Sequence, residues 1–257
     1  MIKTIECFGP SGAGKTYNKK IIEKHLEEKG LKFYDYKKTI LAFSKHELNL
    51  SLKEKLVLFY FKFIKFNFLK KISFFLNKNK KNEFVNSSIN SSFGNNYKIY
   101  NQICNKIYKK FKTKNLKFVN FVNKSIEESN FNSKTKNVFK NWFIQECAGK
   151  YLSHKHGKKF DVLLDSEGFI QRINIYAYTK KNKTKIIQNY LKLCPLPDIL
   201  IISRARKSIK KKYVKKELTI SLKEQLTIYK KTLSILKKKN NLKIMNKSLS
   251  KKISKFI

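Results

Sequence analysis

The octet GPSGAGKT (9–16) decides the fold of this chain. It matches the pattern G-x-x-x-x-G-K-[ST], whose fixed positions are Gly9, Gly14, Lys15 and Thr16. Glycine is rare in the chain, with 8 residues in all, and three of them fall within the octet. An apolar run precedes it at 2–8, and helical spacing follows it over 15–29. The octet therefore predicts a strand, a tight loop and a helix, the opening unit of an α/β fold.

A loop of this composition is suited to wrapping a phosphate chain. Backbone N–H groups can approach the phosphates only where side chains do not block them, and the following helix adds its positive N-terminal end. We expect Lys15 to reach the β- and γ-phosphates of a nucleotide, and the Thr16 hydroxyl to hold Mg²⁺. The predicted nucleotide-binding residues are Gly9, Pro10, Ser11, Gly12, Ala13, Gly14, Lys15 and Thr16. The alternative is a glycine-rich turn that binds no ligand.

The rest of the chain alternates between α/β patterns at both ends and a helical middle. Further strands are predicted at 31–36, 160–165, 194–203 and 242–246. Further helices are predicted at 138–153 and at 169–179, followed by a second, lysine-rich helix that ends at Leu193. Two more are predicted at about 221–238 and at the C-terminus. Polar breaks at 77–83 and 86–96 are interpreted as loops. We predict a three-layer fold with a five-stranded parallel sheet, in which a nucleotide-binding core (1–37 and 160–257) carries a large helical insertion (38–159).

Several charged residues outside the octet are candidates for chemistry. Asp165 ends the apolar run FDVLLD, where a strand-end acid could hold the metal, although an acidic turn residue gives the same pattern. Glu167 could act as a general base toward an acceptor, or could only be an acid at a helix start. Only three arginines, Arg172, Arg204 and Arg206, occur in this lysine-rich chain, and their retention favours a contact of the guanidinium group with phosphate. For Arg204 and Arg206 the alternative is a solvated, lysine-rich helix start.

These motifs resemble the P-loop nucleotide kinases of the thymidylate-kinase-like and deoxynucleoside-kinase-like type. The likeness lies in GPSGAGKT (9–16), in VLLDSEGFIQR (162–172), and in LPDILIIS (196–203) followed by a basic segment. The resemblance implies a five-stranded sheet with the octet's strand at its centre, and a basic lid after the fourth strand. It covers roughly 1–36 and 160–257, and only the octet is specific.

The chain also departs from that family. A thymidylate kinase would show Asp-Arg-Tyr where this chain has DSEGF (165–169), and a deoxynucleoside kinase would show Glu-Arg-Ser. Lysines 210–212 stand where such a lid carries arginines. We interpret the insertion as a helical cap over a bulkier acceptor or over a partner.

Composition and charge limit the classes of partner that we expect for this chain. The net charge of +42 suggests polyanions, but only three of the 59 Lys and Arg residues are arginine. An AT-rich genome would impose such a bias, so we expect no nucleic-acid partner. The aromatic segment 56–76 contains four lysines, so we predict no transmembrane segment there; we favour a buried helix and keep membrane-interface contact as the alternative. Four scattered cysteines and the absence of a signal-peptide pattern indicate a cytoplasmic protein.

The sequence therefore predicts a kinase that transfers the γ-phosphoryl group of MgATP to a small or a sugar- or lipid-linked acceptor. The predicted catalytic residues are Lys15, Asp165, Glu167, Arg172, Arg204 and Arg206, with Thr16 and Asp165 as metal ligands. One alternative is a nucleotide-dependent binding or regulatory module without transfer activity. Another is a binder of anionic surfaces in which the charge itself is the function.

Overall fold

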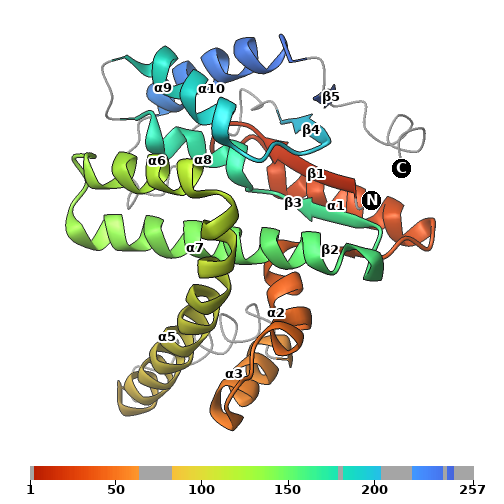
Figure 1. Ribbon diagram of the computed structural model, residues 1–257, viewed down its shortest axis with the longest axis vertical. Coiled ribbons are helices and arrows are strands. Elements are labelled where there is room, and N and C mark those ends of the chain that lie inside the picture. Colours follow the sequence, from red (N-terminus) through yellow and green to blue (C-terminus); the bar gives the residue numbers. More distant parts are fainter. Residues whose placement is uncertain (1–2, 64–82, 179–181, 204–221, 240–241, 246–257) are drawn as a thin grey trace. The chain divides into compact units, whose positions relative to one another are not determined.

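The computed structural model describes residues 3–63, 83–178, 182–203, 222–239 and 242–245 (Figure 1). The chain divides into two compact units. Unit 1 comprises Met1–Asp35, Lys114–Lys140 and His156–Ile257, and unit 2 comprises Tyr36–Thr113 and Asn141–Lys155. The predicted C-terminal helix and basic lid, including Arg204 and Arg206, lie outside the described residues.

Unit 1 is built on a five-stranded sheet with strand order β2-β3-β1-β4-β5. Its strands are β1 (Lys3–Phe8), β2 (Phe33–Tyr34), β3 (Val162–Asp165), β4 (Ile199–Ile202) and β5 (Lys243–Met245). Every neighbouring pair is parallel, and the octet's strand lies at the centre. The predicted α/β class and parallel sheet are confirmed. The second strand is shorter than predicted, because Tyr36 already begins a helix.

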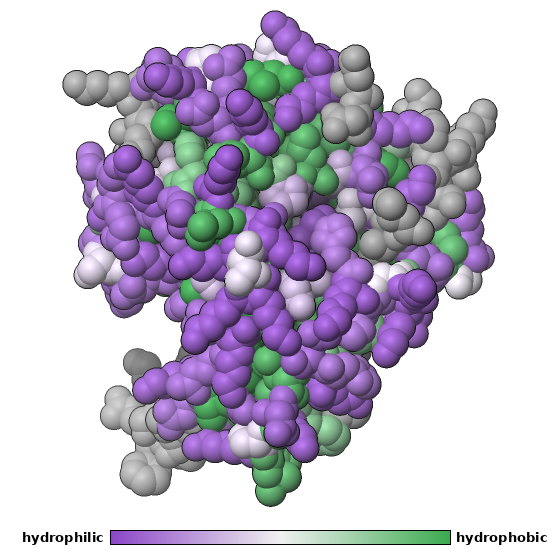
Figure 2. Space-filling model, in the orientation of Figure 1, coloured by the Kyte–Doolittle hydropathy of each residue, from purple (hydrophilic) through white to green (hydrophobic). Residues whose placement is uncertain are grey.

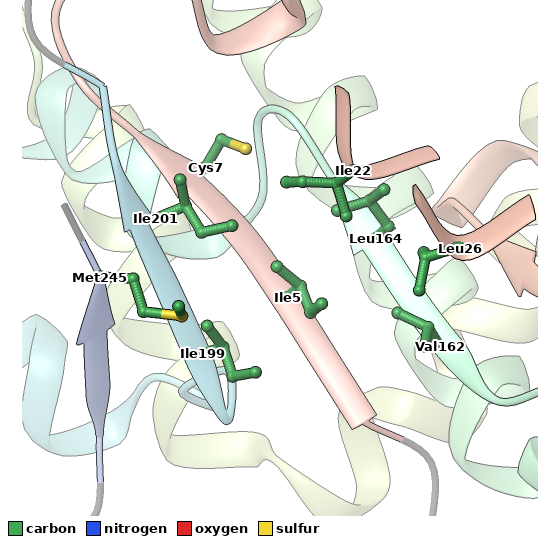
Figure 3. Packing of buried hydrophobic residues seen from close by; sticks show 9 residues of the cluster. All are labelled: Ile5, Cys7, Ile22, Leu26, Val162, Leu164, Ile199, Ile201 and Met245. Atoms are coloured by element: carbon green, nitrogen blue, oxygen red, sulfur yellow. The ribbon is translucent and has the colours of Figure 1, made fainter. Parts of the chain in front are cut away.

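One face of the sheet packs against helix α1 (Lys15–Glu28). Alternate strand residues point to this side, and Ile22 and Leu26 of α1 meet them (Figure 3). The strand residues in this cluster are Ile5, Cys7, Val162, Leu164, Ile199, Ile201 and Met245. All are nearly inaccessible to solvent, so this apolar layer anchors the strand before the octet and the helix after it.

The other helices of unit 1 pack against one another. They are α6 (Leu116–Glu127), α8 (Phe169–Tyr176), α9 (Lys183–Leu193) and α10 (Leu222–Leu236), with a short 3₁₀ turn at Gly157–Lys159. The ring of Tyr229 in α10 lies 5.1 Å from that of Phe8, whose neighbour Cys7 joins the cluster beside α1. Because successive strand residues face opposite sides, α1 and α10 contact opposite faces of the sheet. The arrangement is compatible with a three-layer α/β fold.

Unit 2 is helical in its described residues. It contains α2 (Tyr36–Glu47), α3 (Leu52–Phe63), most of α5 (Glu83–Lys114) and the second part of α7 (Ser133–Lys155). The predicted loop at 86–96 is wrong, because α5 runs through it. Asn and Ser lower helix propensity by less than about 1 kcal/mol each, and no proline interrupts the segment. The packed turns that follow, with Ile103 and Ile107 buried, can therefore extend the helix backward.

The compact units do not coincide with the predicted domains. Residues 114–140 lie inside the predicted insertion but group with the sheet, where Phe118 of α6 packs edge-on against Phe169 of α8 with ring centroids 5.4 Å apart. No helix among the described residues is long and apolar enough to cross a membrane.

Candidate functional site

The octet forms a tight loop between β1 and α1. Two of its glycines have left-handed backbone angles, with φ of 74° at Gly12 and 81° at Gly14, which other residues adopt only with strain. The Ala13 N–H donates to the Pro10 carbonyl at 3.1 Å, and α1 begins with the Asn18 N–H donating to the Gly14 carbonyl at 2.9 Å. Glycine at these positions therefore allows the chain to turn and enter a helix at once.

The loop presents open backbone donors. Within the part of the chain that the structure describes, the N–H groups of Gly14, Lys15 and Thr16 have no hydrogen-bond acceptor. Consecutive unpaired N–H groups at a helix start carry the positive end of the helix dipole. This arrangement can bind an anion such as a phosphate group.

Buried polar groups hold the start of the loop in place. The Gly9 N–H donates to Gln171 Oε1 at 3.1 Å, and the Gln171 N–H donates to Glu6 Oε1 at 3.0 Å. A Cβ atom on Gly9 would clash with the Ser203 carbonyl oxygen, and one on Gly168 would lie 2.6 Å from the Glu6 carboxyl carbon. Gly9 is thus required by the close approach of a backbone carbonyl, and Gly168 leaves room for the buried Glu6 side chain.

The side chain of Lys15 folds back into the loop. Its Nζ atom donates to the carbonyl oxygens of Gly9 at 3.2 Å and Pro10 at 3.3 Å. The Glu167 carboxylate lies 3.8 Å from the same Nζ atom. Burial lowers the pKa of Lys15 below the ordinary lysine value, and the Glu167 charge only partly opposes that effect. The Lys15 cation is therefore incompletely neutralised, which favours binding of a further anion.

Glu167 joins two cations. Its second carboxylate oxygen lies 3.9 Å from Nη1 of Arg172, and the Arg172 charge also acts on Lys15. Glu167 itself is 53% exposed and precedes the start of α8, whereas Arg172 is mostly buried on that helix. The fold thus brings together three of the predicted residues, Lys15, Glu167 and Arg172.

The predicted metal ligands lie at the same edge of the sheet. Asp165 is half-buried at the end of β3, in register with Glu6 of β1, and Thr16 is exposed on the first turn of α1. The carboxyl ends of parallel strands meet at one edge, where ligands bind in open α/β sheets. Among the described residues, no group of three or more His, Cys, Asp or Glu side chains could hold a metal by itself. The metal role of Thr16 and Asp165 stays a prediction.

Sequence reasoning missed an acid at this edge. Asp35 follows β2, and its Oδ2 atom lies 2.8 Å from Nζ of Lys19 in α1. Burial alone would lower the pKa of Lys19, but Asp35, with help from Asp165, outweighs burial and raises it. The signal was available, because Asp35 stands near the end of the predicted strand 31–36, as Asp165 stands at the end of the predicted strand 160–165.

Glu6 and Gln171 were also missed. A glutamate inside the apolar run KTIECF (3–8) is the signal for Glu6, since burial of an unpaired carboxylate is costly and implies a partner. Its partner, the Gln171 N–H, is 165 positions away in the chain and could not be predicted from local pattern.

Comparisons with protein-family models, with curated proteins and with solved structures found no match to this chain.

Proposed function

We propose that this chain is a P-loop kinase that binds MgATP in the loop Gly9–Thr16 and transfers its γ-phosphoryl group. The observation that carries the proposal is the placement of Lys15. Its ammonium group is buried in the turn of a loop with open N–H groups, and it lies 3.8 Å from the Glu167 carboxylate, which also faces Arg172. A structural turn without a ligand would not need a buried, under-neutralised cation beside unpaired donors.

Lys15 and the loop N–H groups would neutralise the nucleotide phosphates. At present Nζ of Lys15 donates to two neutral carbonyl oxygens, and a phosphate oxygen is a stronger acceptor than either. Binding would therefore exchange two neutral contacts for a charge-assisted one. It would also raise the pKa of Lys15 from its lowered value, because the added negative charge favours the protonated amine.

Thr16 and Asp165 are the residues that would hold Mg²⁺. Oxygen ligands suit this ion; Asp165 ends β3, and Thr16 lies in the first turn of α1, directly after the loop that follows β1. When bound, Mg²⁺ would offset the negative charge of the phosphate oxygens. The partly exposed carboxylates at this edge fit such an ion, because they supply charge without enclosing it in a closed protein cage.

Glu167 and Arg172 would act on the acceptor and on the transferred phosphoryl group. In the transfer, an acceptor hydroxyl oxygen forms a bond to the γ-phosphorus while the bond from that phosphorus to the β–γ bridging oxygen breaks. ADP leaves with the electron pair, and the acceptor proton passes to Glu167. Arg172 would stabilise the charge on the transferred group. We propose a small or a sugar- or lipid-linked hydroxyl compound as the acceptor.

Nucleotide binding is tested by thermal unfolding with MgATP, MgADP and MgGTP. A nucleotide at about 100 times its dissociation constant should stabilise the protein by roughly 2.7 kcal/mol. Lys15→Ala should abolish the shift, whereas Lys20→Ala, an exposed lysine on the same helix, should retain it. Absence of a shift with every Mg²⁺-nucleotide would overturn the proposal.

Phosphoryl transfer is tested with ATP labelled in its γ-phosphate and a panel of hydroxyl acceptors. Label should appear in an acceptor, and Asp165→Asn should reduce the rate by at least about tenfold if Asp165 holds the metal. Hydrolysis that no acceptor stimulates would instead support a nucleotide-dependent binding module. Unchanged transfer in Asp165→Asn would remove the metal role of that residue.

A further inference from the structure

Helix α3 exposes a ridge of large apolar side chains. Leu52 is 75% exposed, Leu56 is 59% exposed and Phe59 is 61% exposed. Their spacing of four and three residues places them on one face of the helix. Apolar residues on the other side of α3, Val57, Leu58 and Phe61, are buried. The ridge is therefore additional to the apolar face that unit 2 uses for its own core.

Figure 2 shows apolar atoms at the surface among hydrophilic ones at the lower end of the view, where Figure 1 places α3. The charges that border the ridge are positive. At 100° per residue, Lys53 lies on one side of the ridge, and Lys55 and Lys62 lie on the other, and all three are exposed. The acid of this helix, Glu54, is only 12% exposed and accepts a hydrogen bond from Lys106 at 2.7 Å.

We propose that α3 docks onto an anionic lipid bilayer, with Leu52, Leu56 and Phe59 entering the interface and the three lysines contacting lipid headgroups. A helix that lies in a membrane interface has this pattern of an apolar face edged by lysines. A stable protein interface uses about 20–30 residues a side, far more than this ridge supplies. The charge complements an anionic surface, and the net charge of +42 adds long-range attraction to it.

This inference is independent of the proposed kinase function. It concerns only unit 2, and its test needs no nucleotide. Failure of vesicle binding would leave the nucleotide test unaffected, and loss of nucleotide binding would leave the vesicle test unaffected.

The test is cosedimentation of the full chain with vesicles. Binding should occur with phosphatidylglycerol and phosphatidylcholine mixtures and should be at least tenfold weaker with phosphatidylcholine alone. Part of it should persist at about 0.5 M salt, where the Debye length is only about 4 Å and adsorption by charge alone is suppressed.

Substitution of the ridge separates insertion from general electrostatic adsorption. L52S/L56S/F59S should weaken binding at about 0.5 M salt by at least tenfold, because each large apolar side chain that leaves water contributes roughly a factor of ten. Leu116→Ser, which changes an exposed leucine of α6 in unit 1, should bind as the wild type does. Circular dichroism should show that both variants retain their helical content.

Substitution of the bordering lysines tests the charge. A lysine beside an anionic surface adds roughly a factor of five in affinity. K53Q/K55Q/K62Q should therefore weaken binding far more than K98Q/K109Q/K112Q, which removes the same charge from exposed positions on α5.

Three results would overturn the proposal. They are absence of binding to the anionic vesicles, equal binding by wild type and the ridge variant at high salt, and equal weakening by Leu116→Ser. If the wild type is an oligomer that the ridge variant turns into a monomer, while vesicle binding is unchanged, the ridge is an interface between copies of the chain.

Discussion

The loop end of the sheet in unit 1 and the helix ends of unit 2 differ in how completely a buried charge is neutralised by its neighbours. In unit 2, the Glu47 side chain is almost completely buried and lies 2.9 Å from Nζ of Lys155 and 3.2 Å from Nζ of Lys110. Burial would raise the pKa of Glu47, but these two lysines outweigh burial and lower it. In unit 1, the buried Nζ atom of Lys15 lies 3.8 Å from the Glu167 carboxylate, which also lies 3.9 Å from Nη1 of Arg172.

The difference separates charges that stabilise a fold from charges that can bind a ligand. Glu47 is a buried acid compensated by two cations at hydrogen-bond distance, so little is gained by adding another ion. Lys15 is a buried cation at longer range from a carboxylate that it shares with Arg172, so an added anion would strengthen the charge balance at Lys15. In a chain with 59 Lys and Arg residues, charge itself is uninformative, whereas the balance of charge at a buried position points to a site.

The largest effect is expected at Gly9, where loop and sheet are in closest contact. Gly9→Val should lower the free energy of unfolding by about 3 kcal/mol, because its side chain would overlap the Ser203 backbone carbonyl, which cannot rotate away. Denaturant unfolding measures this. Gly94→Ala is the control, since Gly94 in α5 has open space around it and alanine should stabilise the helix by about 0.5–1 kcal/mol. Equal effects of the two substitutions would mean that the loop is not in contact with the end of β4.

The next effect tests the compensated charge in unit 2. Glu47→Gln should cost about 2 kcal/mol, the loss of charge-assisted hydrogen bonds to a buried group. Because the pKa of Glu47 is lowered in the folded state, this stability is present above the ordinary glutamate pKa. It is lost as the pH falls through the lowered value.

Unfolding of wild type and Glu47→Gln at neutral and acidic pH should therefore converge as the pH falls. Glu127→Gln is the control, because Glu127 is exposed and pairs with Lys140 at the surface, where we expect no measurable change. A constant difference between wild type and Glu47→Gln across the pH range would contradict the assigned ion pairs.

The smallest effect concerns the acid that sequence reasoning missed. Asp35→Asn should cost about 1 kcal/mol, because the pair with Lys19 is partly buried and Lys19 keeps Glu23 at 3.7 Å as a second partner. Because Asp35 raises the pKa of Lys19, the stability from this pair is present below the ordinary lysine pKa and is lost as the pH rises through the raised value.

The Asp35→Asn variant also tests whether Asp35 only stabilises the fold or acts at the nucleotide-binding loop. If Asp35 only neutralises Lys19, ATP turnover should follow the small loss of stability. A loss of turnover of tenfold or more in a folded variant would place Asp35 among the residues that act on the nucleotide or its metal.

Much of the fold followed from local patterns. The strands β1, β3 and β4 are short apolar runs, and α1 has its apolar residues at helical spacing and a glycine after its end. Local pattern failed at 86–96, where Asn and Ser indicated a loop. Propensity differences there are small, and the packing of the following turns outweighs them.

By itself, the sequence determined that the chain opens with a strand, a glycine loop and a helix of an α/β fold. Glycine placement and apolar periodicity are local properties of the chain, so they can be recognised without the tertiary structure. Only the tertiary structure decided which charges meet. The contacts of Lys15 with Glu167, of Gly9 with Gln171 and of Gln171 with Glu6 join positions more than a hundred residues apart. Such contacts depend on strand order and register, which align the ends of β1, β3 and β4 at one edge, and a local pattern carries no information about that alignment.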